Sequence, residues 1–106
     1  MQEYYVYIMA SGRNGTLYVG MAEGLKGRVA KHRNGSGSKF VQKYEINQLV
    51  YFERYENKQT ALVRERQLKK WNRRWKIRLI EQLNPNWKDI CPKVKIYGSP
   101  AEDRVS

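Results

Sequence analysis

Cysteine is nearly absent from the sequence, and long apolar runs are absent altogether. Cys91 is the one cysteine among 106 residues, so an intrachain disulfide is excluded, and a lone thiol is typical of a reducing cytosol. No apolar run approaches the roughly 20 residues that span a bilayer. The residues from Met1 to Tyr5 have neither the basic nor the apolar region of a signal peptide. We therefore expect a cytoplasmic protein with no membrane partner.

The motifs of several enzyme classes are also missing. Cys/His clusters do not occur, which argues against a structural zinc site. The phosphate-binding pattern Gly-x-x-x-x-Gly-Lys-Ser/Thr is absent, as is Gly-x-Gly-x-x-Gly after a strand. No serine lies in a nucleophile elbow, and the single histidine, His32, has no evident cysteine or serine partner. Nucleotide-binding folds and hydrolases with a serine or cysteine nucleophile are therefore disfavoured.

Positive charge is what the sequence has in excess. Lysine and arginine number 21 against 10 acidic residues, which gives a net charge of +11. Self-repulsion makes such an excess costly, and a polyanionic partner is its usual reason. Nucleic acid is the first candidate; an anionic membrane surface and a merely basic soluble protein are the alternatives. The cations concentrate in residues 64–78, as a track suited to a phosphate backbone: Arg64, Arg66, Lys69, Lys70, Arg73, Arg74, Lys76 and Arg78.

Local patterns predict a short series of strands and helices. Residues 4–9 and 16–21 are rich in aromatic and β-branched side chains and flank Asn14-Gly15, a strong signal for a β-hairpin. Gln48–Tyr55 has the composition of a third strand. Lys39–Tyr44 is ambiguous. Helices are predicted from Glu23 to Arg33, from Asn57 or Thr60 to Lys70, and from Trp71 to Leu83.

The last predicted helix has an apolar stripe that recurs every four residues and is widened by Ile80: Trp71, Trp75, Leu79 and Leu83. This is core spacing, so we interpret the two tryptophans as packing and not as base-stacking residues. A polar loop around Pro85 ends the helix, and Trp87 is expected to fold back onto the core.

The order of elements predicts one α+β domain: a small antiparallel three-stranded sheet flanked by helices, in the order β-β-α-β-α-α. We place this domain at residues 1–90. Residues 91–106 contain two prolines and mixed charge, and we expect a flexible C-terminal tail. Val94-Lys95-Ile96-Tyr97 is an alternative edge strand within it.

Two groups of residues could take part in catalysis, but each also has an ordinary structural explanation. Tyr5 and Tyr7 share one face of the first strand, and the hairpin can place Tyr18 beside them, either in a site or as an aromatic core pair. Arg28 and His32 are four residues apart and share a helix face. That face can reach a phosphate, or it can simply be solvated.

Glu65 is the third such feature. It lies four residues after Ala61 and three before Leu68, so it points along the apolar stripe of its helix. A carboxylate that faces inward must be paired or must bind a cation. A salt bridge to a neighbouring Lys or Arg is one explanation. A ligand for Mg²⁺ is the other, because that ion often takes only one or two carboxylates.

These features, taken in order along the chain, resemble the GIY-YIG nuclease superfamily. The similarity is to its small stand-alone members, which are similar to the N-terminal nuclease domain of the bacterial excision-repair subunit UvrC. Tyr5 stands where the family name has glycine. The match covers about residues 4–90, on these segments: Tyr5-Val6-Tyr7, Tyr18-Val19-Gly20, Arg28, His32, Arg64–Trp71, Leu79–Glu81, Asn84-Pro85 and Trp87.

The resemblance implies a one-metal endonuclease that hydrolyses phosphodiester bonds, in DNA that is branched, damaged or structured. Glu65 would hold the divalent ion, Mg²⁺ with Mn²⁺ as a substitute. Tyr18 would deprotonate or orient the attacking water, and Arg28 would stabilise the negative charge that develops on phosphate. Tyr7 would help to fix the water and the scissile phosphate. His32 is a candidate for proton relay or phosphate contact.

DNA is the expected partner, and the oligomeric state is not indicated by the sequence. A non-catalytic nucleic-acid-binding module with the same fold is the alternative, and a basic adaptor for an acidic protein is a third hypothesis. We assign contacts with nucleic acid to six basic residues: Lys26, Lys31, Lys69, Lys70, Arg73 and Arg74.

Overall fold

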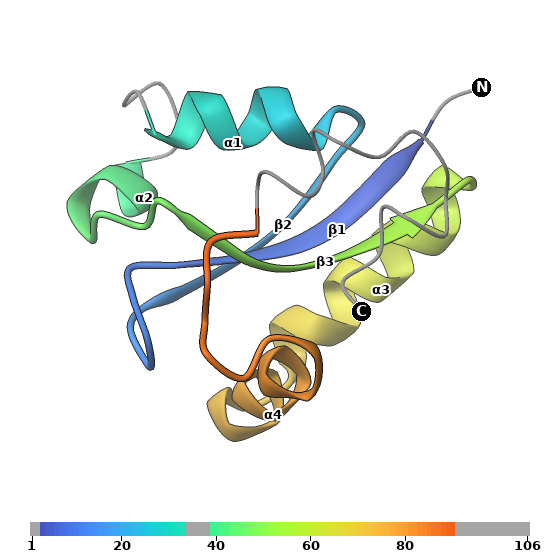
Figure 1. Cartoon of the computed structure of the whole chain (residues 1–106). Helices are drawn as coiled ribbons and strands as arrows, with labels where there is room; N and C mark the ends of the chain where they lie inside the picture. Colours follow the sequence, from blue (N-terminus) through green and yellow to red (C-terminus); the bar gives the residue numbers. More distant parts are fainter. Residues whose placement is uncertain (1–2, 34–38, 91–106) are drawn as a thin grey trace.

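A three-stranded antiparallel sheet with helices on both faces forms the molecule (Figure 1). The structure is a computed structural model, and it describes residues 3–33 and 39–90. None of its helices within these ranges is long and apolar enough to cross a membrane. The elements are β1 (Tyr4–Ala10), β2 (Leu17–Ala22), α1 (Leu25–Arg33), α2 (Lys39–Lys43), β3 (Gln48–Tyr55), α3 (Lys58–Lys70) and α4 (Arg73–Leu83).

The predicted α+β class and the order of its main elements are confirmed. The ambiguous segment Lys39–Tyr44 forms the short helix α2 just before β3. The predicted tail at 91–106, with the alternative strand Val94-Lys95-Ile96-Tyr97, lies outside the described residues.

The sheet has the order β2-β1-β3, so the first strand of the chain is the central one. Every residue of β1 is buried, as expected for a strand with a partner on each side and helices above and below. Tyr7, at the middle of β1, faces Gly20 of β2 across one pairing and Phe52 of β3 across the other. The predicted hairpin is confirmed, and Asn14 in its turn has the positive φ of 57° that asparagine tolerates.

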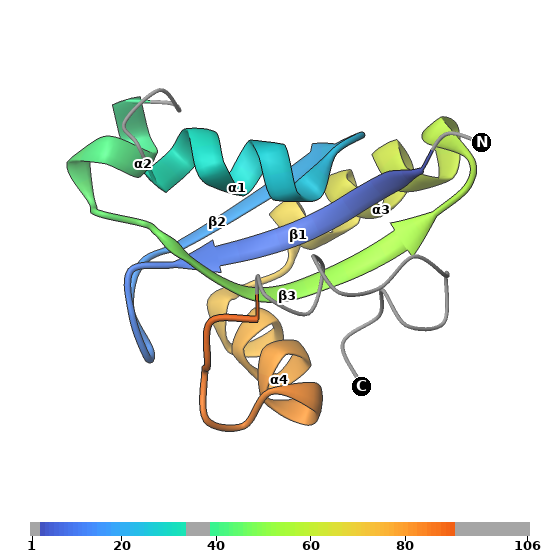
Figure 2. The same cartoon turned by 45° about the horizontal axis from the view of Figure 1, so that its top comes forward.

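The two faces of the sheet support different helices (Figure 2). Alternate residues of β1 point to opposite sides. One side packs against α1, in a cluster that includes Tyr5, Tyr7, Met9, Leu25 and Val29. The other side packs against α3 and α4, in a cluster that includes Val6, Ile8, Ala61, Leu68 and Ile80. The predicted return of Trp87 to the core is confirmed, because it is buried in this second cluster.

Capping residues determine where α3 and α4 begin and end. The Asn57 side chain accepts a hydrogen bond from the Thr60 amide (3.0 Å), so Asn57 is the N-cap of α3 and Thr60 is not. The Asn72 side chain caps α4 in the same way through the Trp75 amide (2.9 Å). Trp71 is therefore the C-cap of α3 and not the first residue of the next helix.

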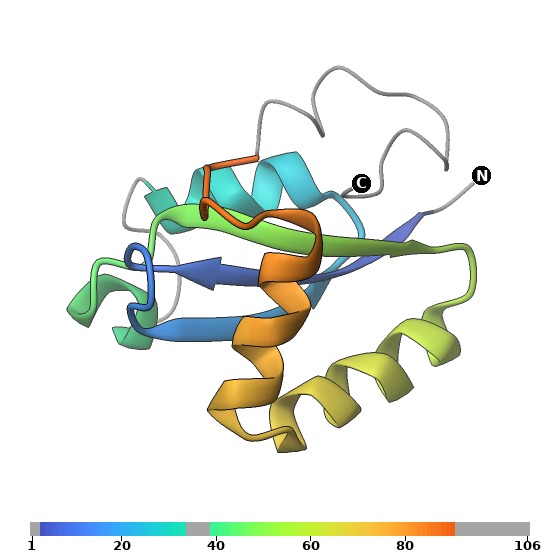
Figure 3. The same cartoon turned by 60° about the horizontal axis from the view of Figure 1, so that its bottom comes forward.

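The predicted packing role of the α4 stripe is wrong for half of its residues. Figure 3 shows α4 returning from the end of α3 toward β3. Ile80 is fully buried on its inner side, whereas Trp75 and Leu83 are 50% and 42% exposed. Trp71 and Leu79 are only partly buried against the core. The helix packs on the sheet along one side only, so the stripe predicted as core spacing turns partly to solvent.

Candidate active site

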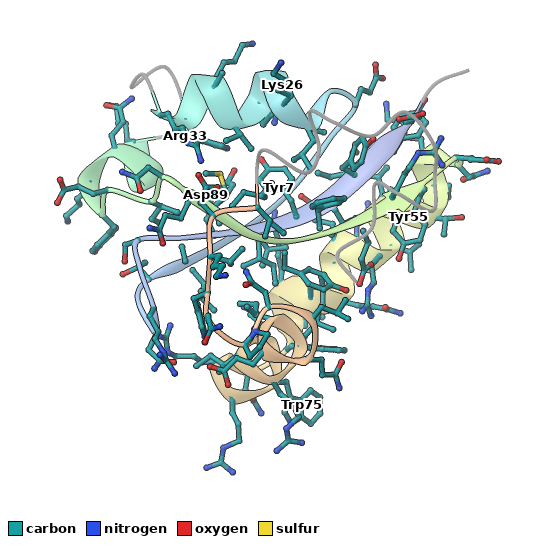
Figure 4. All side chains as sticks on the ribbon, viewed as in Figure 1. Tyr7, Lys26, Arg33, Tyr55, Trp75 and Asp89 are labelled. Carbon is teal, nitrogen blue, oxygen red and sulfur yellow. The ribbon has the colours of Figure 1, made fainter. Side chains whose placement is uncertain are left out.

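Three rings from different elements meet on the α1 side of the sheet. Tyr7 comes from β1, Tyr18 from β2 and His32 from α1. The Tyr18 and His32 rings pack edge to face at 5.3 Å, and the Tyr7 ring lies 6.3 Å from Tyr18 and 6.1 Å from His32. Figure 4 shows Tyr7 between the sheet and α1. Tyr7 and His32 are 0% and 6% exposed, while Tyr18 is half-buried and is the accessible member of the cluster.

A hydrogen bond joins Tyr7 and His32, with 3.1 Å between Oη and Nε2. Burial raises the pKa of Tyr7 to about 12, with a further contribution from Tyr18. Burial, helped by the charge of Arg28, lowers the pKa of His32. At neutral pH both side chains are therefore uncharged, as burial of an ionisable group favours.

The second nitrogen of His32, Nδ1, is buried and has no hydrogen-bond partner among the described residues. Whether the Tyr7 hydroxyl donates to Nε2 or accepts from it depends on which ring nitrogen carries the imidazole proton. A buried polar atom without a partner is costly, and such atoms call for a functional or structural explanation.

Arg28 and Glu65 bring opposite charges to this cluster. The positive charge of Arg28 lowers the pKa of Tyr7 and the negative charge of Glu65 raises it, although burial is the largest influence. Both groups therefore lie within electrostatic reach of the Tyr7 hydroxyl. Arg28 is exposed on α1, one turn before His32. The Glu65 side chain, from α3, is 17% exposed and forms an ion pair with Lys69 at 3.2 Å.

Gly20 is a residue of the site to which the sequence gives no role of its own. It pairs with Tyr7 across β1 and β2. A Cβ atom at this position would lie 2.6 Å from Tyr7 Oη and 2.7 Å from Tyr7 Cζ, well inside van der Waals contact. Gly20 therefore provides the space in which the Tyr7 phenol rests. The motif Tyr18-Val19-Gly20 contained this signal, but its meaning depends on strand register.

An open cleft of about 450 Å³ lies beside the cluster, between the end of β2 and the start of α1. Three of the residues that line it are cations: Arg28, Lys31 and Lys58. Lys58, at the start of α3, was not among the predicted contacts. The cleft thus joins the catalytic candidate Arg28 to two lysines that suit phosphate groups.

The six predicted nucleic-acid contacts lie in two separate groups. Lys26 and Lys31 are exposed on α1, and Lys70 and Arg74 are exposed on the other side of the sheet. Lys69 is the ion-pair partner of Glu65. Arg73 is attached to the β1–β2 turn, where its Nη2 donates to the Gly15 carbonyl oxygen at 2.7 Å. In the structure Arg73 therefore holds the β1–β2 turn through this hydrogen bond.

Comparison with known proteins assigns this arrangement to a family. The GIY-YIG catalytic domain matches the chain over residues 3–78. The chain belongs to the GIY-YIG family. This membership indicates a nuclease-type function that acts on nucleic acid. The matched range includes the five residues predicted for catalysis: Tyr7, Tyr18, Arg28, His32 and Glu65.

The chain is also similar to UPF0213 proteins of Staphylococcus and Bacillus species. The chain is 38% identical over 82 residues to UPF0213 protein SSP2268 of Staphylococcus saprophyticus, and 40% identical over 82 residues to UPF0213 protein SAV0488 of Staphylococcus aureus. Each alignment covers 77% of this chain and 99% of the relative. The NMR structure of UPF0213 protein BH0048 from Bacillus halodurans is similar with a TM-score of 0.52, at 25% identity over 92% of this chain and 99% of that one.

GIY-YIG nucleases generally use a divalent metal, so the donors present here need to suit one. The described residues contain no group of three His, Cys, Asp or Glu side chains that could enclose an ion. Glu65 is the acidic side chain that acts on the cluster. One carboxylate suits Mg²⁺, which commonly keeps several waters and takes its remaining ligands from phosphate. The residues thus fit an ion that is held jointly with the substrate.

Proposed function

We propose that the protein is a metal-dependent endonuclease that hydrolyses phosphodiester bonds in branched, damaged or structured DNA. The proposal rests on one observation: side chains from separate elements act on the same hydroxyl group, that of Tyr7. Rings from β1, β2 and α1 pack together, and the charges of Arg28 on α1 and Glu65 on α3 both act on the hydroxyl of Tyr7. The cluster also leaves His32 Nδ1 buried with no hydrogen-bond partner among the described residues, which costs stability and calls for an explanation.

Tyr18 is the side chain that assists the attacking water. Tyr7 is unsuited to that role because it is fully buried and its pKa is raised to about 12, so it keeps its proton. Tyr18 packs against the same imidazole but remains accessible. Tyr7 and His32 instead form a rigid support for Tyr18, and a general base must be held within hydrogen-bond reach of its water.

Arg28 stabilises the negative charge that develops on the phosphate. Its guanidinium is planar and permanently charged, which suits two phosphate oxygens at once. It lines the open cleft together with Lys31 and Lys58, so a phosphate there meets three cations. Such preorganised donors act most strongly on charge that appears only in the transition state.

Glu65 holds the divalent ion, Mg²⁺ or Mn²⁺, with its carboxylate. When bound, the ion supplies a water of lowered pKa and neutralises phosphate charge. In the structure Lys69 Nζ lies 3.2 Å from Glu65 Oε2, and this ion pair has to open for the metal ion to bind. An ion pair between residues four apart on a helix is worth about 0.3–0.5 kcal/mol, so Lys69 is a weak competitor for the carboxylate.

The charge favours a nucleic acid as the substrate, and we propose that this nucleic acid is DNA. A net charge of +11 on 106 residues provides attraction to phosphate without sequence information. Lys26, Lys31, Lys70 and Arg74 remain exposed as contacts to the backbone. We expect weak sequence preference and a steep loss of affinity as salt increases.

Nicking of a supercoiled plasmid tests the mechanism directly. The wild-type protein should cut in the presence of Mg²⁺ and not in excess chelator. Glu65→Gln should lose at least about 100-fold in rate, because several kcal/mol of charge stabilisation depend on the ion. Glu56→Gln is a matched control, since that glutamate is exposed and outside the cluster. Equal rates for wild type and Glu65→Gln would refute the role of Glu65.

One observation favours a second function, a non-catalytic DNA-binding module. The Lys69–Glu65 ion pair satisfies the carboxylate without a metal. Such a module would bind a branched DNA with strong salt dependence and no metal requirement, and would leave it intact. Binding and cleavage measured on the same branched substrate separate the two functions.

A further inference from the structure

The corner between α3 and α4 has an aromatic surface that the catalytic cluster does not use. A pocket of about 260 Å³ is lined by Trp71, Trp75, Arg78, Leu79 and Gln82. The two indole rings stand edge to face, with centroids 5.7 Å apart and an angle of 88°. Trp75 is 50% exposed, and Figure 4 shows it projecting from α4 away from the sheet. A large indole in this position is an exception to the usual burial of tryptophan.

The surroundings of the two indoles are cationic. Arg78 lines the pocket, and the Arg64 guanidinium, which is paired with the Glu53 carboxylate at 2.9 Å, lies over the Trp71 ring at 5.1 Å from its centroid. No acidic side chain lines the pocket. The nearest acid along α4, Glu81, accepts a hydrogen bond from the Trp87 indole at 2.6 Å. The surface is therefore apolar at its centre and positive around it.

We propose that this surface, the Trp71–Trp75 platform, binds an unpaired nucleobase of single-stranded DNA. This inference rests on the proposed function and names a part of the substrate. A nucleobase has a flat apolar face to lie on an indole, and its own phosphates supply the negative charge that Arg78 attracts. An apolar protein partner would match the indoles but not the charge. Duplex DNA would match the charge but would not offer a base, because its bases are stacked on one another.

The rigidity of the platform supports this occupant. The edge-to-face contact between the indoles and the stacking of Arg64 on Trp71 fix the rings before a ligand arrives. Binding sites that are already ordered lose little conformational entropy when they bind. The mixture of aromatic rings and cations is the combination that proteins use to bind single strands without sequence preference.

The position along α3 also connects the platform with the proposed active site. Trp71 follows Glu65 by six residues, which is about 9 Å along a helix axis. Six residues also turn the helix by about 600°, so the two side chains lie on different sides of α3. A strand whose scissile phosphate lies at Glu65 reaches the platform by passing around α3. The platform would select substrates with a junction between duplex and single strand, since such DNA fills both sites.

The test measures binding in chelator, so that cleavage plays no part. Fluorescence anisotropy follows three labelled probes: a short oligothymidylate, the same length of abasic strand, and a blunt duplex. Trp75→Ala should weaken oligothymidylate binding by about tenfold or more and leave the other two probes unchanged, because only the first probe offers bases to stack. Trp75→Phe should recover part of the affinity. Leu83→Ala is the matched control, as it is equally apolar, 42% exposed and on the same helix.

Three results would overturn the inference. One is unchanged oligothymidylate binding by Trp75→Ala. Another is an equal loss on all three probes, which would indicate a general electrostatic effect. The third is self-association of the wild-type protein that Trp75→Ala abolishes, which would make the platform an interface between copies. None of these bears on catalysis, whereas absence of plasmid nicking by wild type would refute the proposed function and leave the binding result intact.

Discussion

Replacement of Gly20 by alanine is the sharpest single perturbation of the site. The added Cβ would lie 2.6 Å from Tyr7 Oη, whereas ordinary contact begins near 3.4 Å, so the phenol must retreat by about 0.8 Å. Tyr7 is 0% exposed, so its phenol can move only at the expense of the core around it. Gly20 has no left-handed φ, so the backbone itself accepts alanine and the contact alone decides the outcome. Overpacking of this kind costs about 1–3 kcal/mol of stability.

The effect on activity should exceed the effect on stability. A shift of the Tyr7 hydroxyl disturbs its 3.1 Å hydrogen bond to His32, and with it the support of Tyr18. Misplacement of a catalytic group by about 1 Å can cost about 100-fold in rate. We therefore expect Gly20→Ala to remain folded at room temperature, to unfold at lower denaturant concentration, and to nick plasmid about 100-fold more slowly than wild type.

The assay pairs urea denaturation with plasmid nicking, and Gly27→Ala is the matched control for stability. Gly27 lies in α1, and a Cβ there would meet nothing within 4 Å. Alanine in a helix is favoured over glycine by about 0.8–1 kcal/mol, so this variant should be stabilised. Both substitutions replace glycine with alanine, but Gly20→Ala should lower the free energy of unfolding and Gly27→Ala should raise it. Wild-type stability and activity in Gly20→Ala would refute the view that Tyr7 must rest on Gly20.

The remaining predictions concern charge. Glu53→Gln should destabilise the fold by about 2–3 kcal/mol in urea denaturation, because Arg64 donates to both carboxylate oxygens at 2.9 Å and would lose its charged partner. The pKa of His32 is lowered in the folded state, so stability should be complete above the unfolded imidazole pKa of about 6.5 and fall as the pH drops below it, by at most about 1.4 kcal/mol per pH unit. His32→Gln should flatten this slope, and a slope that persists would contradict the assignment. Lys69→Ala should lower the Mg²⁺ concentration for half-maximal nicking by about twofold by freeing Glu65; an increase would show that Lys69 serves the substrate instead.

Much of the fold could be predicted because its elements have strong local patterns. The strand Gln48–Tyr55 was predicted with the bounds that it has, and the hairpin follows from Asn14-Gly15 between two aromatic strands. The short helix α2 was not predicted, because a five-residue helix has too few turns to show an apolar period. Asn57 and Thr60 are equally good N-cap residues by type, and only the structure shows that Asn57 has the extended backbone of a cap, with a φ of −113°.

The candidate site could be predicted as a list of residues but not as an arrangement. Residue types and spacing named Tyr7, Tyr18, Arg28 and His32. They could not show that Tyr7 is buried and holds its proton while Tyr18 stays accessible, because this difference arises from the packing of α1 over the middle of the sheet. They also could not show what Gly20 does. Its role depends on the register that sets it opposite Tyr7, and register is a property of two strands together.

The failure of the packing interpretation for α4 has a physical cause that bears on function. The helix has two apolar sides: Ile80 lies on the inner one, and Trp75 lies on the outer one with Leu83. Periodicity detects both sides but cannot tell which of them the sheet covers. A helix gains stability when it buries its apolar side, so an indole left half exposed contributes less to stability than a buried one. Departures of this kind from local consistency are found where a surface serves a ligand. The residue that the pattern misplaced, Trp75, is for that reason the one on which the proposed binding of unpaired bases depends.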